Sequence, residues 1–554
     1  MSNIYMYIDT EVFCMLKKWW HDKIVYQIYP QSFKDSNGDG LGDINGIIEK
    51  LDYLKELGVD ILWLTPFFTS PMIDNGYDVA DFCDINPLFG SMEDMDKLIS
   101  ETKKRDMYIM IDIVANHTSH EHKWFKEALK GEDNPYYNYY IFKDQIPHEH
   151  WSCFGGSAWE YVPSLNKYYF HEFAVEQPDL NWNNPRVRDE MAAVINFWME
   201  KGIKGIRFDV IHMIGKEVEN NIYGYGPTLH ERVRELYHKS YGKYDIITVG
   251  EAWGNLEQAQ DFTLPEREEL NMVFQFECTS YTNDWSRHGK FTPRPVDFKF
   301  VKDTLTKYQY GLNDCSWNAL MVENHDLGRC INRFGDERYR VESAKAIATY
   351  NYLLKGTPYI YQGQEIGMVN IRMDKLEDYR DVEVYGKYND LVKTGLMSHE
   401  EFMEGAYKEA RDNNRLPIQW DSSKNAGFSN GEETWIKVHP NYQIINAENE
   451  MKEPNSIFSY YKKLLDLRKN GEYASTLVYG KFDAHVQDHD EVFVYTRSDD
   501  KYTIAVVSNM VNRNTYVELP FEIEKVLLQN YSKDYNSNKL ELEPYETLVF
   551  VVKK

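Results

Sequence analysis

The chain has 554 residues, of which 88 are acidic and 62 basic, so its formal net charge is −26. At roughly 150 residues per domain, this length predicts three to four domains, or one large barrel with additions. The charge argues against nucleic acid and against an anionic membrane as partners, because both ligands require clustered Lys and Arg. With 42% hydrophobic and 27% charged residues, the composition is that of a soluble globular protein, for which we favour a monomer.

The N-terminus carries no secretion signal, because Asp9 and Glu11 stand where a basic region followed by an apolar one is needed. No run of about 18 apolar residues occurs, so no transmembrane helix is predicted. Met15 is a candidate alternative start, which would make residues 1–14 a dispensable leader. The six cysteines are scattered without a CxxC pair, which predicts a reduced, cytoplasmic protein without a disulfide framework or zinc site.

Apolar strand-like segments alternate with amphipathic helices along most of the chain, which predicts parallel strands covered by helices. One helical face ends at Gly58, and Ser91 with Asp94 predicts a capping box at the start of another helix. Eight such units that close on themselves favour an α/β fold of the (β/α)8 barrel type. A doubly wound open sheet is the alternative, but no GxGxxG follows the first strand. The predicted strands are 24–30, 59–66, 107–117, 204–210, 245–251, 272–277, 319–326 and 357–363.

Three segments depart from this alternation. Residues 118–185, after the third strand, are rich in Tyr, Asn, Pro, Gly and Trp, which predicts an inserted loop-rich domain. A second irregular segment, 368–450, follows the eighth strand, before a helix at 456–470. Short alternating segments across 472–554 predict a C-terminal all-β sandwich. The barrel is therefore expected to comprise residues 15–117 and 186–471.

Polar residues stand at the ends of four predicted strands, which is where a barrel of this type carries its chemistry. A single acid there often caps the next helix, but four such ends would converge on one mouth. The residues are Asp112, Asn116 and His117 on the third strand, Arg207 and Asp209 on the fourth, Glu251 on the fifth, and Asn324, His325 and Asp326 on the seventh.

Paired carboxylates, one ionised and one protonated, can break glycosidic bonds. Arg207 and Asp209 are two residues apart and share a face of their strand, so we expect Arg207 to lower the pKa of Asp209 and hold it anionic. Glu251 is then left as the acid. Two-metal hydrolysis is the rival use of clustered Asp and His, although the charge of Arg207 would oppose a cation.

The segments DIVANH (112–117), GIRFDV (205–210), VGEAW (249–253) and ENHD (323–326) resemble the four signature regions of the α-amylase superfamily, glycoside hydrolase family 13. They occur in the same order and on the corresponding strands. QPDLNW (177–182) resembles a further region that is typical of the oligo-1,6-glucosidase and α-glucosidase branch. The resemblance runs from about residue 18 to the C-terminus and so covers nearly the whole chain.

The resemblance implies a role for each strand-end residue. Asp209 is expected to be the nucleophile that forms a glucosyl-enzyme intermediate, and Glu251 the general acid and then the base. Asp326 is expected to hold the 2- and 3-hydroxyls of the sugar and to stabilise the transition state. Arg207 would orient Asp209.

Further residues are expected, on the same resemblance, to bind the sugar. His117 and His325 would hydrogen-bond the glucose in the first subsite. Asp78, in NGYDVADF, and Arg415, in ARDNNRLPIQW, would hold the hydroxyls of the non-reducing end. Because this grip blocks further sugars on that side, the enzyme is expected to be exo-acting.

Residues 35–43 read DSNGDGLGD, with oxygen side chains at alternate positions. This is the front of an EF-hand-like loop, but Gly46 stands where a bidentate Glu would complete it. The resembled branch has a structural calcium site in this loop, so we expect Ca²⁺ here, with Mg²⁺ as second choice. The expected ligands are Asp35, Asn37, Asp39, the carbonyl of Leu41, and Asp43.

Val210 follows the expected nucleophile, and in the resembled branch a Val there accompanies α-1,6 cleavage. The expected function is an exo-acting, retaining α-glucosidase of isomalto- and malto-oligosaccharides. Enzymes that cleave trehalose 6-phosphate can also carry this Val, so a trehalose-6-phosphate hydrolase is the alternative. A sucrose-active glucosidase or isomerase is less favoured, because no RLDRD-like stretch follows Arg329.

Overall fold

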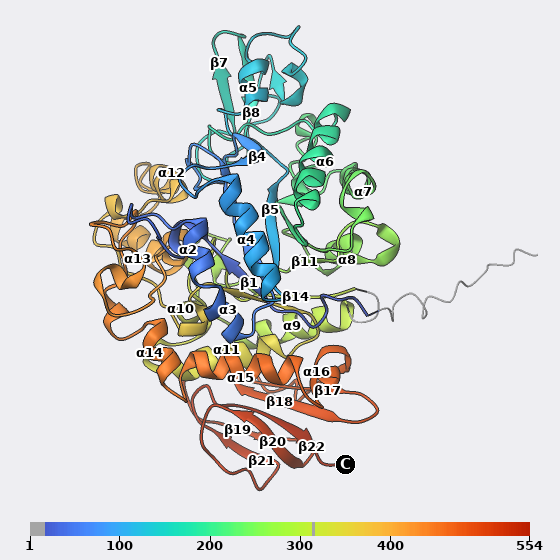
Figure 1. Cartoon of the computed structure of the whole chain (residues 1–554), viewed down its shortest axis with the longest axis vertical. Coiled ribbons are helices and arrows are strands. Elements are labelled where there is room, and N and C mark those ends of the chain that lie inside the picture. Colours follow the sequence, from blue (N-terminus) through green and yellow to red (C-terminus); the bar gives the residue numbers. More distant parts are fainter. Residues whose placement is uncertain (1–16, 313–315) are drawn as a thin grey trace, which may run out of the picture.

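The computed structural model describes residues 17–312 and 316–554. The inserted segment, the barrel and the C-terminal sheets follow one another along the long axis of the molecule (Figure 1). Within the described residues, no helix has the length and apolar character needed to cross a membrane. The prediction about Met15 and residues 1–14 lies outside the described residues.

Eight parallel strands close into a barrel, which confirms the predicted fold class. Every strand lies within the segment predicted for it, and its two neighbours in the barrel are the strands that precede and follow it in the predicted set. The strands are β1 (Val25–Ile28), β2 (Ile61–Leu64), β5 (Tyr108–Val114), β9 (Gly205–Asp209), β10 (Ile247–Glu251), β11 (Met272–Phe274), β14 (Ala319–Leu320) and β15 (Thr357–Tyr361).

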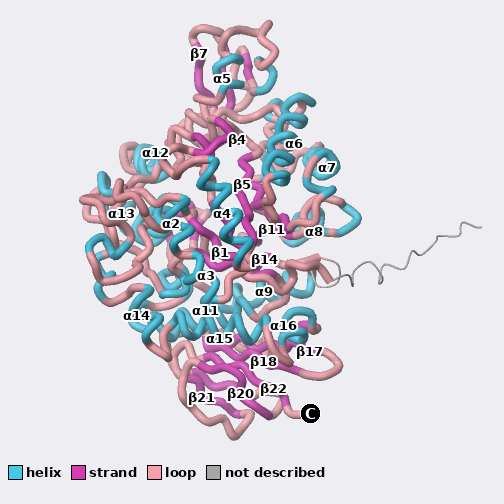
Figure 2. Tube along the Cα trace, viewed as in Figure 1, coloured by secondary structure: helices cyan, strands magenta, loops and turns pink. Residues whose placement is uncertain are grey.

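Helices surround the barrel (Figure 2). They include α2 (Ile44–Glu49), α3 (Leu51–Leu57), α4 (Met92–Lys104), α6 (Pro185–Glu200), α7 (Leu229–Lys239), α8 (Leu256–Thr263), α9 (Phe298–Gly311), α10 (Cys330–Phe334), α11 (Arg340–Tyr352) and α15 (Ile457–Lys469). Ser91 and Asp94 form the predicted capping box at the start of α4. The helix predicted to stop at Gly58 does so, because Gly58 adopts a left-handed conformation there.

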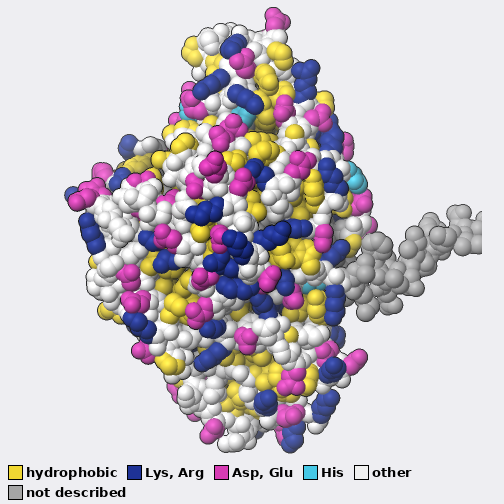
Figure 3. Space-filling model, in the orientation of Figure 1, with side chains coloured by type: hydrophobic (Ala, Val, Ile, Leu, Met, Phe, Trp, Pro, Cys, Tyr) yellow, Lys and Arg dark blue, Asp and Glu magenta, His cyan; other side chains and the backbone are white. Residues whose placement is uncertain are grey.

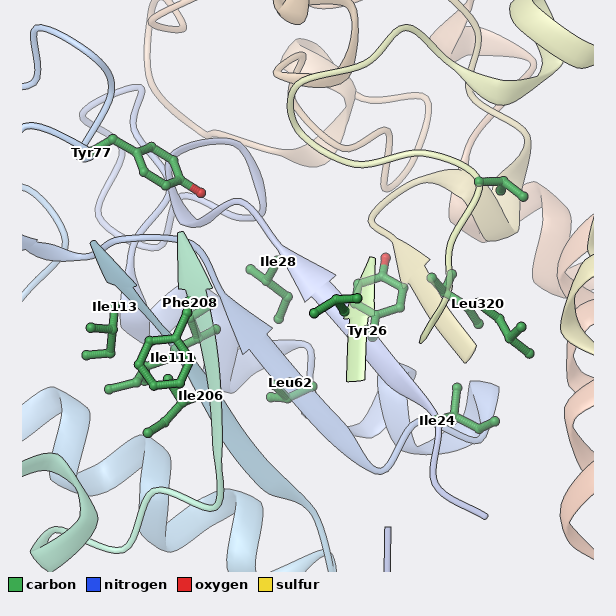
Figure 4. Packing of buried hydrophobic residues seen from close by; sticks show 14 of the residues in the cluster. Ile24, Tyr26, Ile28, Leu62, Tyr77, Ile111, Ile113, Ile206, Phe208 and Leu320 are labelled. Atoms are coloured by element: carbon green, nitrogen blue, oxygen red, sulfur yellow. The ribbon is translucent and has the colours of Figure 1, made fainter. Parts of the chain in front are cut away.

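Side chains alternate between the two faces of each barrel strand, as the period of two requires. One set packs against the helices and includes Tyr26, Leu62 and Phe208 (Figure 4). The other set fills the barrel interior, where Val25, Ile61, Met110 and Ile247 form an apolar layer. Two residues further along, the interior positions become polar on β1 and β5, at Gln27 and Asp112, and Arg207 is polar on β9. On β10 the change comes at Glu251, after the apolar Val249. The site therefore lies at the carboxyl ends of the strands.

The two irregular segments contain short elements. The insertion holds α5 (Lys123–Ala128) and a small sheet of β6 (Phe142–Lys143), β7 (Trp159–Val162) and β8 (Lys167–Phe170). Two hairpins also lie outside the barrel sheet: β3 (Phe68–Thr69) with β4 (Asp81–Ile85), and β12 (Asn283–Asp284) with β13 (Gly289–Pro293). Segment 368–450, predicted as irregular, in fact contains α12 (Val382–Leu391) and α13 (His399–Glu409), and α14 (Ala447–Lys452) begins near its end. Asp381 and Ser398 cap α12 and α13, while Gly386 in mid-helix weakened the sequence signal.

The C-terminal part begins with α16 (Ala474–Tyr479) and continues as two sheets. A five-stranded sheet is formed by β16 (Lys481–His485), β17 (Val492–Ser498), β18 (Thr503–Asn509), β22 (Thr547–Val552) and β20 (Ile523–Gln529), and a two-stranded one by β19 (Thr515–Glu518) and β21 (Lys539–Leu542). Buried residues of the two sheets form one apolar cluster, as in a sandwich. On the face of the molecule in Figure 3, basic side chains gather near the middle and acidic ones are spread around them.

Candidate active site

The carboxyl ends of β5, β9 and β10 bring three carboxylates onto one guanidinium group. Arg207 Nη1 lies 2.6 Å from Asp112 Oδ1 and 2.7 Å from Asp209 Oδ1, and Nη2 contacts Glu251 Oε2. All four side chains are buried. One positive charge thus faces three carboxyl groups, so the cluster cannot be fully ionised without a net negative charge in a buried place.

Burial raises the pKa of Asp209 well above its usual range, and the neighbouring Glu251 and Asp112 act in the same direction. Arg207 opposes this rise but does not overcome it, because burial and the neighbouring carboxyl groups together act against its single charge. Burial likewise raises the pKa of Asp112 to about 6. The expectation that Arg207 holds the pKa of Asp209 low is therefore wrong in its net effect. Burial thus raises the pKa values of Asp209 and Asp112 together, and Arg207 is the charge that opposes both rises.

Strand β9 ends at Asp209, and the next residue turns the chain sharply. Val210 has a φ of 33° and a ψ of 43°, in the left-handed region that a β-branched residue rarely adopts. Its side chain is buried. Strained backbone of this kind persists only where the surrounding structure holds it, and it is common beside reacting groups.

Trp253 is a site residue that the sequence reasoning did not identify. Its Nε1–H donates to Glu251 Oε1 at 2.7 Å, and its ring stacks on Phe276 with 4.1 Å between the centroids. Glu251 is thus held on both oxygens, by Arg207 and by Trp253. The signal was present in VGEAW, which departs from the common Gly-Glu-Met/Thr-Pro pattern, but the contact with Glu251 could not be read from spacing.

His325 and Asp326 lie on the opposite side of the barrel mouth, after β14. Gln27 Nε2 donates to His325 Nδ1 at 2.8 Å, which places the ring proton on Nε2. That nitrogen lies 3.1 Å from Asp326 Oδ2 and 2.6 Å from the hydroxyl of Tyr77. Burial lowers the pKa of His325 to about 3, so the ring is neutral at ordinary pH.

Two arginines from one segment reach Asp326. Arg415 Nη2 lies 3.0 Å and Arg411 Nη1 3.5 Å from Asp326 Oδ1. Burial acts to raise the pKa of Asp326, but the positive charges of Arg411 and Arg415 hold it below its usual range. Asp326 is therefore the carboxylate of the site that stays ionised.

Asp78, expected to grip the sugar, has its carboxylate hydrogen-bonded within its own loop. Its carboxylate is fully buried and accepts from the hydroxyl of Ser70 (3.0 Å) and the backbone N–H groups of Ile73 (2.9 Å) and Asp74 (3.0 Å). These bonds close its own loop. Arg415, the other residue expected at these hydroxyls, contacts Asp326.

Asp74 takes the place that was expected for Asp78. Its Oδ1 lies 3.0 Å from Arg411 Nη2, and its Oδ2 accepts from Gln177 Nε2 at 3.1 Å. Burial raises the pKa of Asp74 to about 6, against the opposing charges of Arg411 and Arg415. Asp74 and Arg411 each stand four residues before a predicted residue, Asp78 and Arg415 respectively.

His117 ends the segment after β5 and is fully buried. Asn116 Nδ2 approaches its Nδ1 at 3.2 Å, and Gln177 Nε2 approaches its Nε2 at the same distance. Burial lowers the pKa of His117 to about 4. The ring is therefore neutral and links the insertion to the barrel mouth.

Loop 35–43 folds back on its own side-chain oxygens. Three side-chain oxygens each accept from the backbone N–H two residues later. Asn37 N donates to Asp35 Oδ1 (3.0 Å), Asp39 N to Asn37 Oδ1 (2.9 Å), and Leu41 N to Asp39 Oδ1 (2.9 Å). The oxygen donors suit calcium. The carboxylate of Asp43 accepts from Ser36 and caps α2 through Gly46 N. Across residues 17–312 and 316–554, no group of three or more His, Cys, Asp or Glu side chains is placed to hold a metal ion.

A (β/α)8 barrel with paired buried carboxylates at its mouth is an arrangement that glycoside hydrolases use. The family model described as the catalytic domain of alpha amylase matches residues 27–480. The chain is 44% identical to the oligo-1,6-glucosidase of Bacillus cereus, over 97% of this chain and 100% of that protein. It is 40% identical to the trehalose-6-phosphate hydrolase of Bacillus subtilis, over 97% and 98%. The isomaltulose synthase from Protaminobacter rubrum shares its fold with a TM-score of 0.94, at 40% identity over 97% of this chain and 100% of that one. The chain belongs to the alpha-amylase family.

Proposed function

We propose that the protein is an exo-acting, retaining α-glucosidase that releases terminal α-1,6-linked glucose, and to a lesser extent α-1,4-linked glucose, from short oligosaccharides. The observation that carries this proposal is the joint binding of Asp209 and Glu251 to the two terminal nitrogens of Arg207. Two carboxyl groups on one guanidinium lie close together, which favours a retaining mechanism, where they are about 5 Å apart. The similarity to an oligo-1,6-glucosidase supports the same substrate class.

In the proposed reaction, Asp209 attacks the anomeric carbon while Glu251 gives its proton to the glycosidic oxygen. The bond to the leaving sugar breaks, and a covalent β-glucosyl ester forms on Asp209. Glu251, now ionised, takes a proton from water as that water attacks the same carbon. Glucose leaves in the α configuration, and both carboxyl groups return to their starting states.

The ionised Asp326 would stabilise the positive charge that develops on the sugar ring in the transition state. Arg411 and Arg415 keep it ionised, as the contacts above support. The exo-action is assigned to Asp74 and Arg411, whose pairing supplies an acceptor and a donor for the hydroxyls of a terminal glucose. A sugar held in this way has no room for a further residue on its non-reducing side.

A trehalose-6-phosphate hydrolase is the alternative, supported by a relative of that name. That function predicts free positive charge near the leaving sugar. Lys290, on the β13 hairpin, acts electrostatically on Asp326, but its Nζ lies 2.7 Å from Glu383 Oε2. Its charge is thereby compensated, which favours an uncharged leaving sugar.

We also propose that loop 35–43 binds Ca²⁺ as a structural ion, through Asp35, Asn37, Asp39 and the carbonyl of Leu41. The alternation of oxygen donors supports this assignment. The ion would stabilise the loop before α2 and takes no part in the reaction.

A substrate panel tests the function: isomaltose, maltose, sucrose and trehalose 6-phosphate, each with Asp209→Ala as control. We expect the highest kcat/KM with isomaltose and almost none in the variant. Preference for the phosphorylated sugar would establish the alternative instead. NMR of the first product distinguishes the stereochemistry, because release of β-glucose would exclude the retaining mechanism.

A further inference from the structure

We infer that Lys216, paired with Asp179, is a positioning residue that fixes the amide of Asn116 and, through it, the ring of His117. The inference rests on the proposed function, in which His117 is a contact of the terminal glucose. It concerns a lysine outside the four signature segments.

Lys216 is a buried cation between two parts of the chain. It stands in the loop after β9, and its side chain is 3% exposed. Its Nζ lies 2.7 Å from Asp179 Oδ2, at the end of the insertion, and 2.5 Å from Asn116 Oδ1, after β5. A buried ion pair contributes little net stability, because desolvation of both groups offsets their attraction. A role in fixing geometry accounts better for its presence.

The pair selects one orientation of the Asn116 amide. Because Lys216 donates to Oδ1, Nδ2 faces away from it and donates to Asp179 Oδ2 at 3.0 Å. The reversed amide would place its NH2 against the ammonium and its carbonyl oxygen against the carboxylate, and both contacts would be repulsive. Nδ2 also approaches His117 Nδ1 at 3.2 Å, so that nitrogen is the acceptor and Nε2 carries the ring proton.

A second fixed amide faces the other nitrogen of His117. Ala174 N donates to Gln177 Oε1 at 2.9 Å, which turns Gln177 Nε2 toward Asp74 Oδ2 and His117 Nε2. A neutral imidazole accepts at one nitrogen only, so the amides of Asn116 and Gln177 compete for the acceptor nitrogen of His117, and the contact that is held more firmly selects the tautomer. The ion pair of Lys216 with Asp179 thus favours the tautomer in which Nδ1 accepts from Asn116.

The hydrogen-bonded series of side chains that begins at Lys216 continues to the carboxylate of Asp326. From Gln177 it passes through Asp74 to Arg411 at 3.0 Å, and from Arg411 to Asp326 at 3.5 Å. Backbone hydrogen bonds dock the insertion independently, since Leu180 N donates to Asn116 O at 2.9 Å. Loss of the ion pair should therefore disturb the orientation of His117 more than the attachment of the insertion.

The test compares Lys216→Met with Lys302→Met as a matched control. Lys302 is equally buried, in α9, and its Nζ bonds the carbonyl of Gln487 at 2.8 Å, outside the site. With p-nitrophenyl α-glucoside and isomaltose, we expect Lys216→Met to lower kcat/KM by roughly 100-fold, because a misplaced sugar contact costs about that much. Lys302→Met should stay within about twofold of the wild type once thermal melts have shown equal folded fractions.

The pH dependence gives a readout that a merely structural role would not move. The charged groups around His117 are Asp179, which raises its pKa, Lys216, which lowers it, and Asp74 beyond the Gln177 amide. Lys216→Met should therefore raise the pKa of His117, and Asp179→Asn should lower it further. The pKa of His117, read from the pH dependence of its ring nitrogen shifts, should therefore rise in the first variant and fall in the second.

Equal losses in Lys216→Met and Lys302→Met would overturn the inference, as would a pKa of His117 that moves in the same direction in Lys216→Met and Asp179→Asn or does not move. A wild-type enzyme inactive on both sugars would instead refute the proposed function. In that case the ring nitrogen shifts of ¹⁵N-labelled histidine still decide the inference: His117 must change tautomer in Lys216→Met and keep it in Lys302→Met.

Discussion

Replacing Arg207 by Met removes the one positive charge that Asp112, Asp209 and Glu251 share. Asp209 must be ionised to attack the sugar. Its pKa is already raised by burial, and Arg207 is the main influence that opposes the rise. Without Arg207 the pKa of Asp209 rises further, so the pH below which activity falls must move upward.

The size of this movement can be worked from the contacts. Two unit charges about 4 Å apart interact by about 4 kcal/mol at an effective dielectric constant of 20. Arg207 acts on Asp209 with this full energy, because Coulomb interactions are pairwise and the other carboxyl groups do not reduce it. Since about 1.4 kcal/mol corresponds to one pH unit, the acidic limb of kcat/KM should move up by about two to three units.

The assay is the pH profile of kcat/KM for p-nitrophenyl α-glucoside. Arg468→Met serves as the control, because Arg468 is fully buried but bonds the backbone oxygens of Tyr352 and Leu354. The control should be less stable than the wild type yet keep its acidic limb. An Arg207→Met limb that stays in place, or moves to lower pH, would refute the electrostatic account of the cluster.

Three further outcomes are expected. Asp74→Ala should lower kcat/KM by about 100-fold with little change in the melting temperature. Asp78→Ala should instead lower the free energy of unfolding by about 3 kcal/mol, because Asp78 accepts three hydrogen bonds in its loop. The opposite pattern would support the role first expected for Asp78. Val210→Ala should lower the ratio of isomaltose to maltose kcat/KM, and an unchanged ratio would remove Val210 from the account of linkage. Calcium at 100 times its Kd should stabilise the protein by about 2.7 kcal/mol, so a melt unchanged between calcium and chelator would exclude an ion in loop 35–43.

The fold was predictable because its signals are local. Alternating apolar residues and strand-end acids located all eight strands, and Arg207 with Asp209 could be placed on one face from the period of two alone. The same rule brought Asp112 and Glu251 to the same mouth. Such inferences need only the direction in which a side chain leaves its strand.

Loop residues could not be assigned in this way. Asp74 and Asp78 lie in the same short loop, and only the three-dimensional path shows that one meets Arg411 while the other closes the turn. The direction of the pKa shift of Asp209 could not be predicted either, because it depends on the balance between burial, Arg207 and the number of carboxyl groups nearby. Trp253 was missed for a related reason: its role is a contact made across a turn.

The interior side chains of the barrel change from apolar to reactive between two successive inward-facing positions, from Met110 to Asp112 and from Val249 to Glu251. The effect of a substitution should therefore change sharply between neighbouring interior positions of one strand. Exchange of one aliphatic residue for another in the apolar layer perturbs packing alone, whereas substitution of the polar residue at the carboxyl end removes a group that takes part in the reaction. A saturation library assayed separately for folding and for turnover would show this boundary: variants of the apolar layer would lose stability, and variants one inward-facing position later would lose turnover.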